Sequence, residues 1–201
     1  MKLAATILAA GRSRRMGSIN KLLLLIENKP ILKIVCENVI KAKLDQIILV
    51  TGYQSKEVLK VVPKDIIKVV QNHDWKKGMM TSIFAGMSKL KKNIDGNIII
   101  LGDMPFISAG TIIHLKGEFE ASNGQSIVYP IYQGRQANPV IFPKKYFSEI
   151  LMSKGDKGCK RVLKKYPKAS IGVRIKSEEV ILDCDTKDDY FYLNKKKLIN
   201  V

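Results

Sequence analysis

Short hydrophobic runs alternate along the chain with segments whose apolar residues recur at helical spacing. Leu3–Ala9, Gln46–Thr51 and Asn97–Leu101 are continuous apolar or β-branched runs, which are typical of strands buried on both faces of a sheet. Shorter runs of the same character predict four more strands, at Ile66–Val70, Val140–Phe142, Ile171–Arg174 and Val180–Leu182.

The segments between these runs predict helices. Proline suits the first position of a helix, so one helix is predicted to begin at Pro30, and Gly78–Leu90 is predicted to form another. The apolar face of the first helix comprises Ile31, Ile34, Val35 and Val39. Ser108 is a candidate N-cap, and Thr186 with Asp189 matches a capping box.

Strands separated by helices predict βαβ units and a mostly parallel sheet. We therefore predict an α/β, Rossmann-like doubly wound fold with helices on both faces, and one domain over residues 1–201, a length that fits a single core. In such sheets, ligands bind beyond the carboxyl ends of the strands. Unusual residues that follow a strand are therefore candidate site residues.

The first candidate is the loop after Leu3–Ala9. Gly11 and Gly17 allow a tight turn and the close approach of backbone amides to phosphate oxygens. Four positive charges gather in or near the same loop, at Arg12, Arg14, Arg15 and Lys21. The loop matches neither the Walker A pattern nor Gly-x-Gly-x-x-Gly. It predicts phosphate binding, with a basic surface turn as the alternative.

The other candidates are aspartates at strand ends. Asp103 directly follows Asn97–Leu101, and Mg²⁺ is typically shared between one or two carboxylates and substrate phosphates. Four more aspartates lie in residues 183–189, and the last two suit the first turn of a helix. We predict that Asp185 joins Asp103 on the metal and that Asp183 ends its strand. A structural role for Asp103 in the turn is the alternative.

In this order, the segments resemble the MobA-like NTP transferase family, and most of all its molybdenum cofactor cytidylyltransferase branch. The resemblance is carried by Leu8–Gly17, Asn72–Met79, Gly102–Pro105, Asn138–Phe142, Gly155–Gly158 and Asp183–Asp189. It implies a Rossmann-like fold and the transfer of CMP from CTP to the phosphate of molybdopterin cofactor, with release of pyrophosphate. It also implies dependence on Mg²⁺, with Mn²⁺ as an alternative metal.

The residues and the resemblance together predict a site. The predicted catalytic residues are Arg15, Lys21 and Asp103, and the predicted metal ligands are Asp103 and Asp185. The predicted nucleotide-binding residues are Leu8, Ala9, Ala10, Gly11, Arg12, Ser13, Gly17, Gly78 and Gly102. The predicted acceptor-binding residues are Asn138, Pro139 and Asp156.

Ala10 bears on the choice of nucleotide. Ala9-Ala10-Gly11 resembles the cytidine-using branch, whereas guanosine-using relatives tend to have Ala-Gly-Gly, and a purine needs more room than a pyrimidine. The departures from the family pattern are one extra residue between Gly17 and Lys21, Ala137-Asn138 where Gly-His is usual, and Cys159-Lys160 where Ala-Arg is usual.

Composition narrows the classes of partner. The net charge of +17, from 35 Lys and Arg against 18 Asp and Glu, favours anionic partners. No signature of a specific nucleic-acid-binding module is present. No run approaches the roughly 20 uncharged apolar residues of a membrane span, so we expect a cytoplasmic protein without a membrane partner. Three widely spaced cysteines predict neither a zinc site nor a disulfide framework.

Two alternatives to the cytidylyltransferase remain open. A sugar- or polyol-phosphate nucleotidyltransferase would share the fold and use another acceptor. A non-catalytic protein would bind a nucleotide or pterin and deliver it to a partner such as a molybdoenzyme. Neither of the two histidines, His73 and His114, is predicted to be catalytic, because a largely dianionic phosphate nucleophile needs alignment and charge neutralisation rather than a base.

Overall fold

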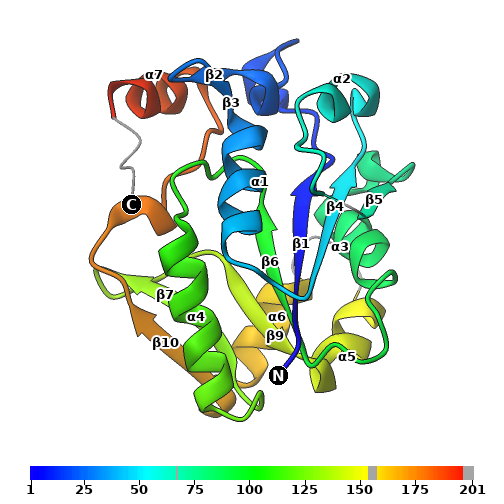
Figure 1. The fold of residues 1–201 in the computed structure, drawn as a ribbon, viewed down its shortest axis with the longest axis vertical. Coiled ribbons are helices and arrows are strands. Elements are labelled where there is room, and N and C mark those ends of the chain that lie inside the picture. Colours follow the sequence, from blue (N-terminus) through cyan, green and yellow to red (C-terminus); the bar gives the residue numbers. More distant parts are fainter. Residues whose placement is uncertain (67, 154–157, 197–201) are drawn as a thin grey trace.

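A single sheet organises the computed structural model, which describes residues 1–66, 68–153 and 158–196 (Figure 1). Within the described residues this sheet has eight strands, in the order β10-β7-β9-β6-β1-β4-β5 with β8 paired to β7. Its strands are β1 (Leu3–Ala9), β4 (Gln46–Thr51), β5 (Lys68–Gln71), β6 (Gly96–Leu101), β7 (Ile127–Tyr132), β8 (Arg135–Gln136), β9 (Val140–Pro143) and β10 (Ser170–Arg174). A separate small hairpin pairs β2 (Leu25–Ile26) with β3 (Lys29–Pro30).

The order in which the chain adds strands to the sheet reverses at β1. It passes from β1 to β4 and β5 on one side, and then crosses to β6 on the other side. Leu8 of β1 consequently has Val50 of β4 and Leu101 of β6 as its neighbours, both on parallel strands. Doubly wound sheets bind ligands in the crevice that such a switch point opens between carboxyl ends of adjacent strands.

Helices cover both faces of this sheet. They are α1 (Ile31–Lys41), α2 (Ser55–Lys60), α3 (Met79–Met87), α4 (Ala109–Ala121), α5 (Phe147–Met152), α6 (Gly158–Lys165) and α7 (Lys187–Lys195). Figure 1 shows α1 and α4 in front of the sheet, where Leu32 and Leu115 join one core cluster with Ile7. A second cluster lies with α3, α5 and α6 and includes Ile83 and Ile150.

The predicted mostly parallel, doubly wound fold is confirmed. Parallel pairs join β1 to β4 and β6, β4 to β5, and β7 to β10, whereas β9 runs antiparallel to both of its neighbours. The strands Leu3–Ala9 and Gln46–Thr51 have the predicted bounds. Both predicted caps are present: the Ser108 side chain accepts from the Thr111 amide, and Thr186 forms a capping box with Asp189.

The prediction of a strand at Val180–Leu182 is wrong. Glu178–Val180 instead forms a 3-10 turn, η6, whose cap Ser177 accepts a hydrogen bond from the Glu179 amide. The Glu179 carboxylate accepts from the hydroxyls of Ser108 and Thr111, which fixes η6 to the start of α4. Val180 is fully buried by this arrangement, so its hydrophobicity reflects burial of a turn rather than of a strand.

Other boundaries also differ from the sequence predictions, and the strands β6, β9 and β10 are each one residue longer than predicted. The strand predicted at Ile66–Val70 begins at Lys68, because the Ile66 amide closes a turn on Pro63. The first helix begins at Ile31, since Pro30 belongs to the β2–β3 hairpin. The helix predicted at Gly78–Leu90 is α3, Met79–Met87.

The described part of the chain contains no helix that is both long enough and apolar enough to cross a membrane.

Candidate active site

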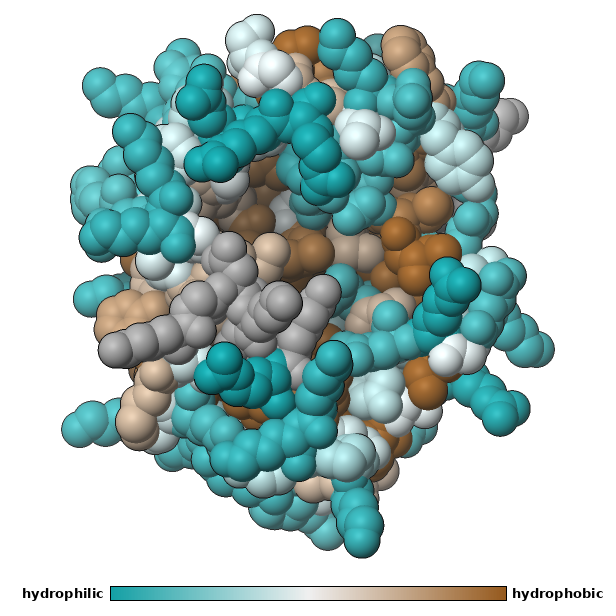
Figure 2. Space-filling view, turned by 180° about the vertical axis from the view of Figure 1, so that it is seen from behind, coloured by the Kyte–Doolittle hydropathy of each residue, from teal (hydrophilic) through white to brown (hydrophobic). Residues whose placement is uncertain are grey.

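A cavity of about 580 Å³ lies at the carboxyl ends of β1 and β6. On the face of the molecule shown in Figure 2, hydrophobic residues lie at the floor of a hollow that hydrophilic residues surround. The residues that line the cavity are Leu8, Ala9, Ala10, Gly11, Arg12, Arg14, Arg15, Lys21, Leu22, Trp75, Lys76, Lys77, Gly78, Met79, Ser82, Leu101, Asp103, Asp183 and Asp185. The cavity therefore combines an apolar floor, six cationic side chains and three carboxylates.

The loop after β1 folds back so that its basic residues reach the cavity. It contains a 3-10 turn at Arg14–Met16, flanked by Ser13 with φ 57° and Gly17 with φ 72°. The Ser13 hydroxyl accepts a hydrogen bond from the Lys21 amide at 3.2 Å. This contact brings Lys21 to the cavity despite the extra residue between Gly17 and Lys21.

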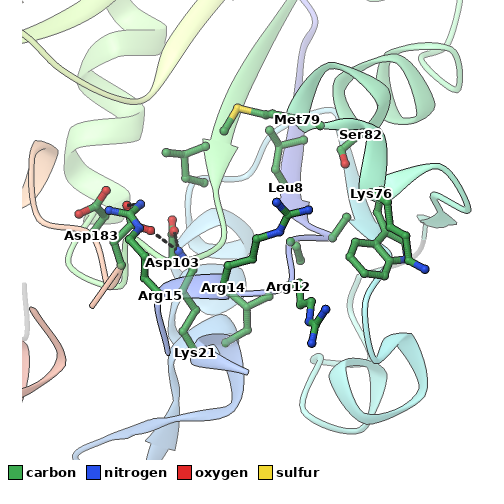
Figure 3. A pocket seen from close by; sticks show the side chains of 18 of the residues that line it. Leu8, Arg12, Arg14, Arg15, Lys21, Lys76, Met79, Ser82, Asp103 and Asp183 are labelled. Carbon is green, nitrogen blue, oxygen red and sulfur yellow. Dashed lines mark hydrogen bonds and ion pairs between the residues drawn. The ribbon is translucent and has the colours of Figure 1, made fainter. Parts of the chain in front are cut away.

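Carboxylates and cations meet at one end of the cavity (Figure 3). Asp103 follows β6 and Asp185 precedes α7, and the amide of Cys184 donates to the carbonyl oxygen of Asp103 at 3.0 Å. The Lys21 ammonium donates to Asp103 and also to Asp185, with 2.6 Å between Lys21 Nζ and Asp185 Oδ1. Arg15 donates to the other oxygen of Asp185. Among the predicted catalytic and metal-binding residues, Arg15 and Lys21 therefore both contact Asp185, and Lys21 also contacts Asp103.

Burial and charge act in opposite directions on these groups. Burial lowers the pKa of Lys21, but Asp103 and Asp185 outweigh it, so the pKa lies above its ordinary value. Burial raises the pKa of Asp185, but Lys21 and Arg15 outweigh it and hold the pKa below its ordinary value. Burial and then the charges of Asp185 and Asp103 raise the pKa of Asp183, and the opposing charge of Lys21 does not outweigh them.

The carboxylates fit a hard divalent cation. Asp103 Oδ1 is buried and has no hydrogen-bond partner within the described residues, and the Lys21 ammonium already bridges Asp103 and Asp185 as a cation. No group of three or more His, Cys, Asp or Glu side chains among the described residues is arranged to hold a metal. Two carboxylates are nevertheless enough for Mg²⁺, which takes its other ligands from phosphates and water.

The opposite end of the cavity combines the aromatic side chain of Trp75 with Lys76, whose ammonium lies 5.6 Å from the centroid of the Trp75 ring. Trp75 lies in the 3-10 turn η3, Trp75–Lys77, and Gly52 packs so closely that a Cβ there would come within 2.8 Å of Trp75 and Ala10. The buried side chain of Asn72 donates to the hydroxyls of Thr81 and Ser82, at 2.8 and 3.0 Å. Its oxygen accepts from the Asp74 amide at 2.9 Å. Asn72 therefore fastens this wall to α3.

The predicted nucleotide-binding residues divide into two groups. Leu8, Ala9, Ala10, Gly11, Arg12 and Gly78 line the cavity. Ser13, Gly17 and Gly102 do not: the first two shape the loop, and a Cβ at Gly102 would approach the Leu8 carbonyl oxygen to 2.8 Å. Ala10 is almost fully buried, and its side chain lies within 2.8 Å of the position that a Cβ at Gly52 would occupy.

The predicted acceptor-binding residues lie away from this lining. Asn138 and Pro139 are joined by a cis peptide bond, and the Asn138 amide donates to the Val180 carbonyl oxygen at 3.2 Å. They stand beside η6, outside the residues that line the cavity. Asp156, with Gly155 and Lys157, lies outside the described residues.

Sequence reasoning missed several residues of the cavity. Asp183 was predicted to end a strand, but it lines the cavity beside Asp185. Trp75 and Ser82 also line it, and neither is among the predicted site residues, although Trp75 belongs to a segment that carries the family resemblance. Their signal is indirect, since the Asn72–Met79 segment begins directly after β5, at the same edge of the sheet as the loop after β1.

Comparison with known proteins places this geometry among nucleotidyltransferases. Residues 5–170 match the MobA-like NTP transferase domain. The molybdenum cofactor cytidylyltransferase of Escherichia coli (strain K12) is 27% identical over 185 residues, 92% of this chain and 91% of that protein. A probable molybdenum cofactor guanylyltransferase of Methanosarcina mazei is 31% identical over 153 residues, 73% of this chain but only 66% of that protein.

Solved structures agree with the family match. The crystal structure of Rv0371c from Mycobacterium tuberculosis H37Rv superposes with a TM-score of 0.87 at 26% identity and covers 98% of both chains. A structure of Rv0371c in complex with manganese gives a TM-score of 0.84 at 24% identity, and covers 98% of this chain and 100% of that one.

Proposed function

The chain belongs to the MobA-like NTP transferase family, and from this premise we propose that it transfers CMP from CTP to the phosphate of molybdopterin cofactor. The observation that carries the proposal is the convergence of Lys21 and Arg15 on Asp103 and Asp185, at the switch point of the sheet. Substrate phosphates and a metal would meet where these cations and carboxylates meet.

The proposed chemistry suits the side chains that line the cavity. No histidine or cysteine is among the described lining residues, and none is needed, because a terminal phosphate with a second pKa near 6 is already a good nucleophile at neutral pH. The protein must align that phosphate with the α-phosphorus of the nucleotide and stabilise the departing pyrophosphate. Arg12, Arg14, Arg15 and Lys21 supply positive charge for this task.

We assign each end of the cavity a role in substrate binding. The loop after β1 holds the β- and γ-phosphates through Gly11 and its arginines. Asp103 and Asp185 would hold Mg²⁺, which neutralises phosphate charge and polarises the α-phosphate when it is bound. The base would lie against the wall of Ala10, Trp75 and Gly78.

Similarity to relatives of known or probable function supports the choice of acceptor and base. The full-length likeness to the E. coli cytidylyltransferase, together with Ala9-Ala10-Gly11, favours CTP and the molybdopterin cofactor. Likeness to the M. mazei protein, a probable guanylyltransferase, makes GTP the competing nucleotide. Delivery of the product to a molybdoenzyme would follow transfer.

A test of the proposal measures pyrophosphate release by the purified protein with Mg²⁺ and molybdopterin cofactor, and compares CTP, GTP and ATP. Release with CTP alone is the expected result. Release with GTP alone would reassign the base. Release only when sugar or polyol phosphates replace the pterin would reassign the acceptor.

A further inference from the structure

The side chain of Lys21 occupies the position where the proposed function needs a metal. Its ammonium lies in direct contact with one oxygen of Asp103 and with Oδ1 of Asp185, the two proposed metal ligands. The Lys21 and Asp103 side chains are only 13% and 14% exposed, so water does little to stabilise the carboxylate charge of Asp103. Two such carboxylates need a positive charge, and Lys21 supplies it.

Arg15 extends the same arrangement to a second cation. It pairs with Asp185 Oδ2, so Lys21 and Arg15 together engage three of the four carboxylate oxygens. The fourth oxygen, Asp103 Oδ1, is buried and without a hydrogen-bond partner in the described chain. The cations that the proposed function assigns to the triphosphate are therefore the same cations that neutralise the metal ligands.

The side chain of Lys21 can change partners, whereas its backbone is held in place. Its backbone amide donates to the Ser13 hydroxyl, and the neighbouring Leu22 amide donates to the buried side chain of Asn20 at 3.1 Å. These bonds hold the backbone of the 3-10 turn Lys21–Leu23 (η2) in place. The flexible lysine stem can move its ammonium from the carboxylates toward the loop after β1 without refolding.

We propose that Lys21 is an exchangeable counter-ion, which holds Asp103 and Asp185 in the nucleotide-free protein and yields them to the divalent metal when a triphosphate binds. This inference rests on the proposed function. An ammonium and a divalent cation repel each other and need the same oxygens, so the metal binds weakly until phosphates draw Lys21 and Arg15 away. Metal and nucleotide consequently bind cooperatively, and each raises the affinity for the other.

A manganese titration of the nucleotide-free protein, followed by the electron paramagnetic resonance signal of free Mn²⁺, tests the proposal. Lys21→Met removes the charge and keeps an unbranched side chain. It should tighten Mn²⁺ binding by a factor of about 5–150, the usual range for coupled sites. Lys29→Met is the matched control, because Lys29 pairs with Glu37 at 3.4 Å and does not line this cavity. It should leave Mn²⁺ affinity unchanged.

Unchanged or weaker Mn²⁺ binding by folded Lys21→Met protein would overturn the proposal, since Lys21 would then support the metal site instead of occupying it. If the variant does not fold, the wild-type protein with ¹³C-labelled lysine gives the answer. The Lys21 Cε signal should move when Mg²⁺ and a non-hydrolysable CTP analogue are added together, and should stay in place with Mg²⁺ alone. An equal movement with Mg²⁺ alone contradicts the exchange.

These measurements separate the exchange from the proposed function. Neither readout needs turnover or an acceptor, so an inactive protein can still show the predicted gain in Mn²⁺ affinity. A protein that releases pyrophosphate from CTP but shows no gain on Lys21→Met would keep the proposed function and lose the exchange.

Discussion

Two cavities of this protein gather acidic and basic side chains, and they use them differently. The second cavity, of about 770 Å³, lies between α1, the start of α4 and η6. Each of its carboxylates has its own partner: Glu37 pairs with Lys29, Glu178 with Lys196, and Glu179 with two hydroxyls. In the candidate active site, one lysine serves two aspartates, and a buried carboxylate oxygen has no hydrogen-bond partner in the described chain.

The difference shows what separates a structural charge cluster from a reactive one. The second cavity is larger and is also lined by charged side chains, but each of its ion pairs is complete and its paired side chains are 31–54% exposed. In the active-site cluster, the Lys21 and Asp103 side chains are only 13% and 14% exposed, and the single ammonium of Lys21 is shared between two carboxylates. Shared cations and unfilled acceptors, and not the size of a cavity, indicate where a ligand belongs.

The largest expected effect comes from Asp103→Asn. The change keeps the size of the side chain but removes a carboxylate from the proposed metal and phosphate site, so kcat should fall by about 10²–10³-fold or more. Circular dichroism should show an unchanged fold. Full activity in this variant would remove Asp103 from the proposed mechanism.

Asn72→Ala should have the next largest effect. Loss of the bonds to Thr81, Ser82 and the Asp74 amide leaves buried polar groups unpaired, which should lower the free energy of unfolding by about 1–3 kcal/mol. The Trp75 wall should loosen, so KM for the nucleotide should rise more than kcat falls. Urea denaturation and steady-state kinetics measure the two effects, and an equal loss in kcat would argue that Asn72 acts on the reacting phosphates.

Asp183→Asn should stabilise the nucleotide-free protein. Because the pKa of Asp183 is raised in the folded state, its ionisation costs stability as the pH rises above the ordinary aspartate pKa and through the folded-state value. The asparagine variant should melt about 1–4 °C higher near pH 7. The gain should shrink as the pH falls toward the ordinary aspartate pKa of about 4. A gain that persists unchanged at low pH would assign the effect to something other than charge.

Lys29→Met should have the smallest effect. The Lys29 side chain is 54% exposed in its pair with Glu37, and such surface pairs contribute about 0–1 kcal/mol. Melting temperature and activity should both stay close to wild type. A large loss of activity would instead give the second cavity a functional role and would contradict its assignment as a structural charge cluster.

The sequence was sufficient for the features that depend on local pattern. The buried strands Leu3–Ala9 and Gln46–Thr51 stand out because both faces are apolar, and the caps Ser108 and Thr186 because their hydrogen bonds are local. Position after a strand was also enough to bring the loop after β1 and Asp103 to the same edge of the sheet.

What the sequence could not supply depends on contacts between distant segments. Strand β7 contains Pro130, a residue that argues against a strand. The carbonyl oxygen of Pro130 nevertheless accepts a hydrogen bond from the amide of Ala137, in the segment that follows β8. The buried turn at Val180 has the composition of a strand. Asp183 and Trp75 become site residues only because the fold brings their segments to one cavity.

Transfer of labelled phosphorus tests the central claim most directly. The protein is incubated with Mg²⁺, molybdopterin cofactor and CTP labelled at either the α- or the γ-phosphorus, and the products are separated. The account predicts that the α-label appears in the pterin product and the γ-label in pyrophosphate, because the bond between the α- and β-phosphates is broken. A γ-label in the acceptor, or the absence of any labelled product from folded protein, would contradict nucleotidyl transfer at this site.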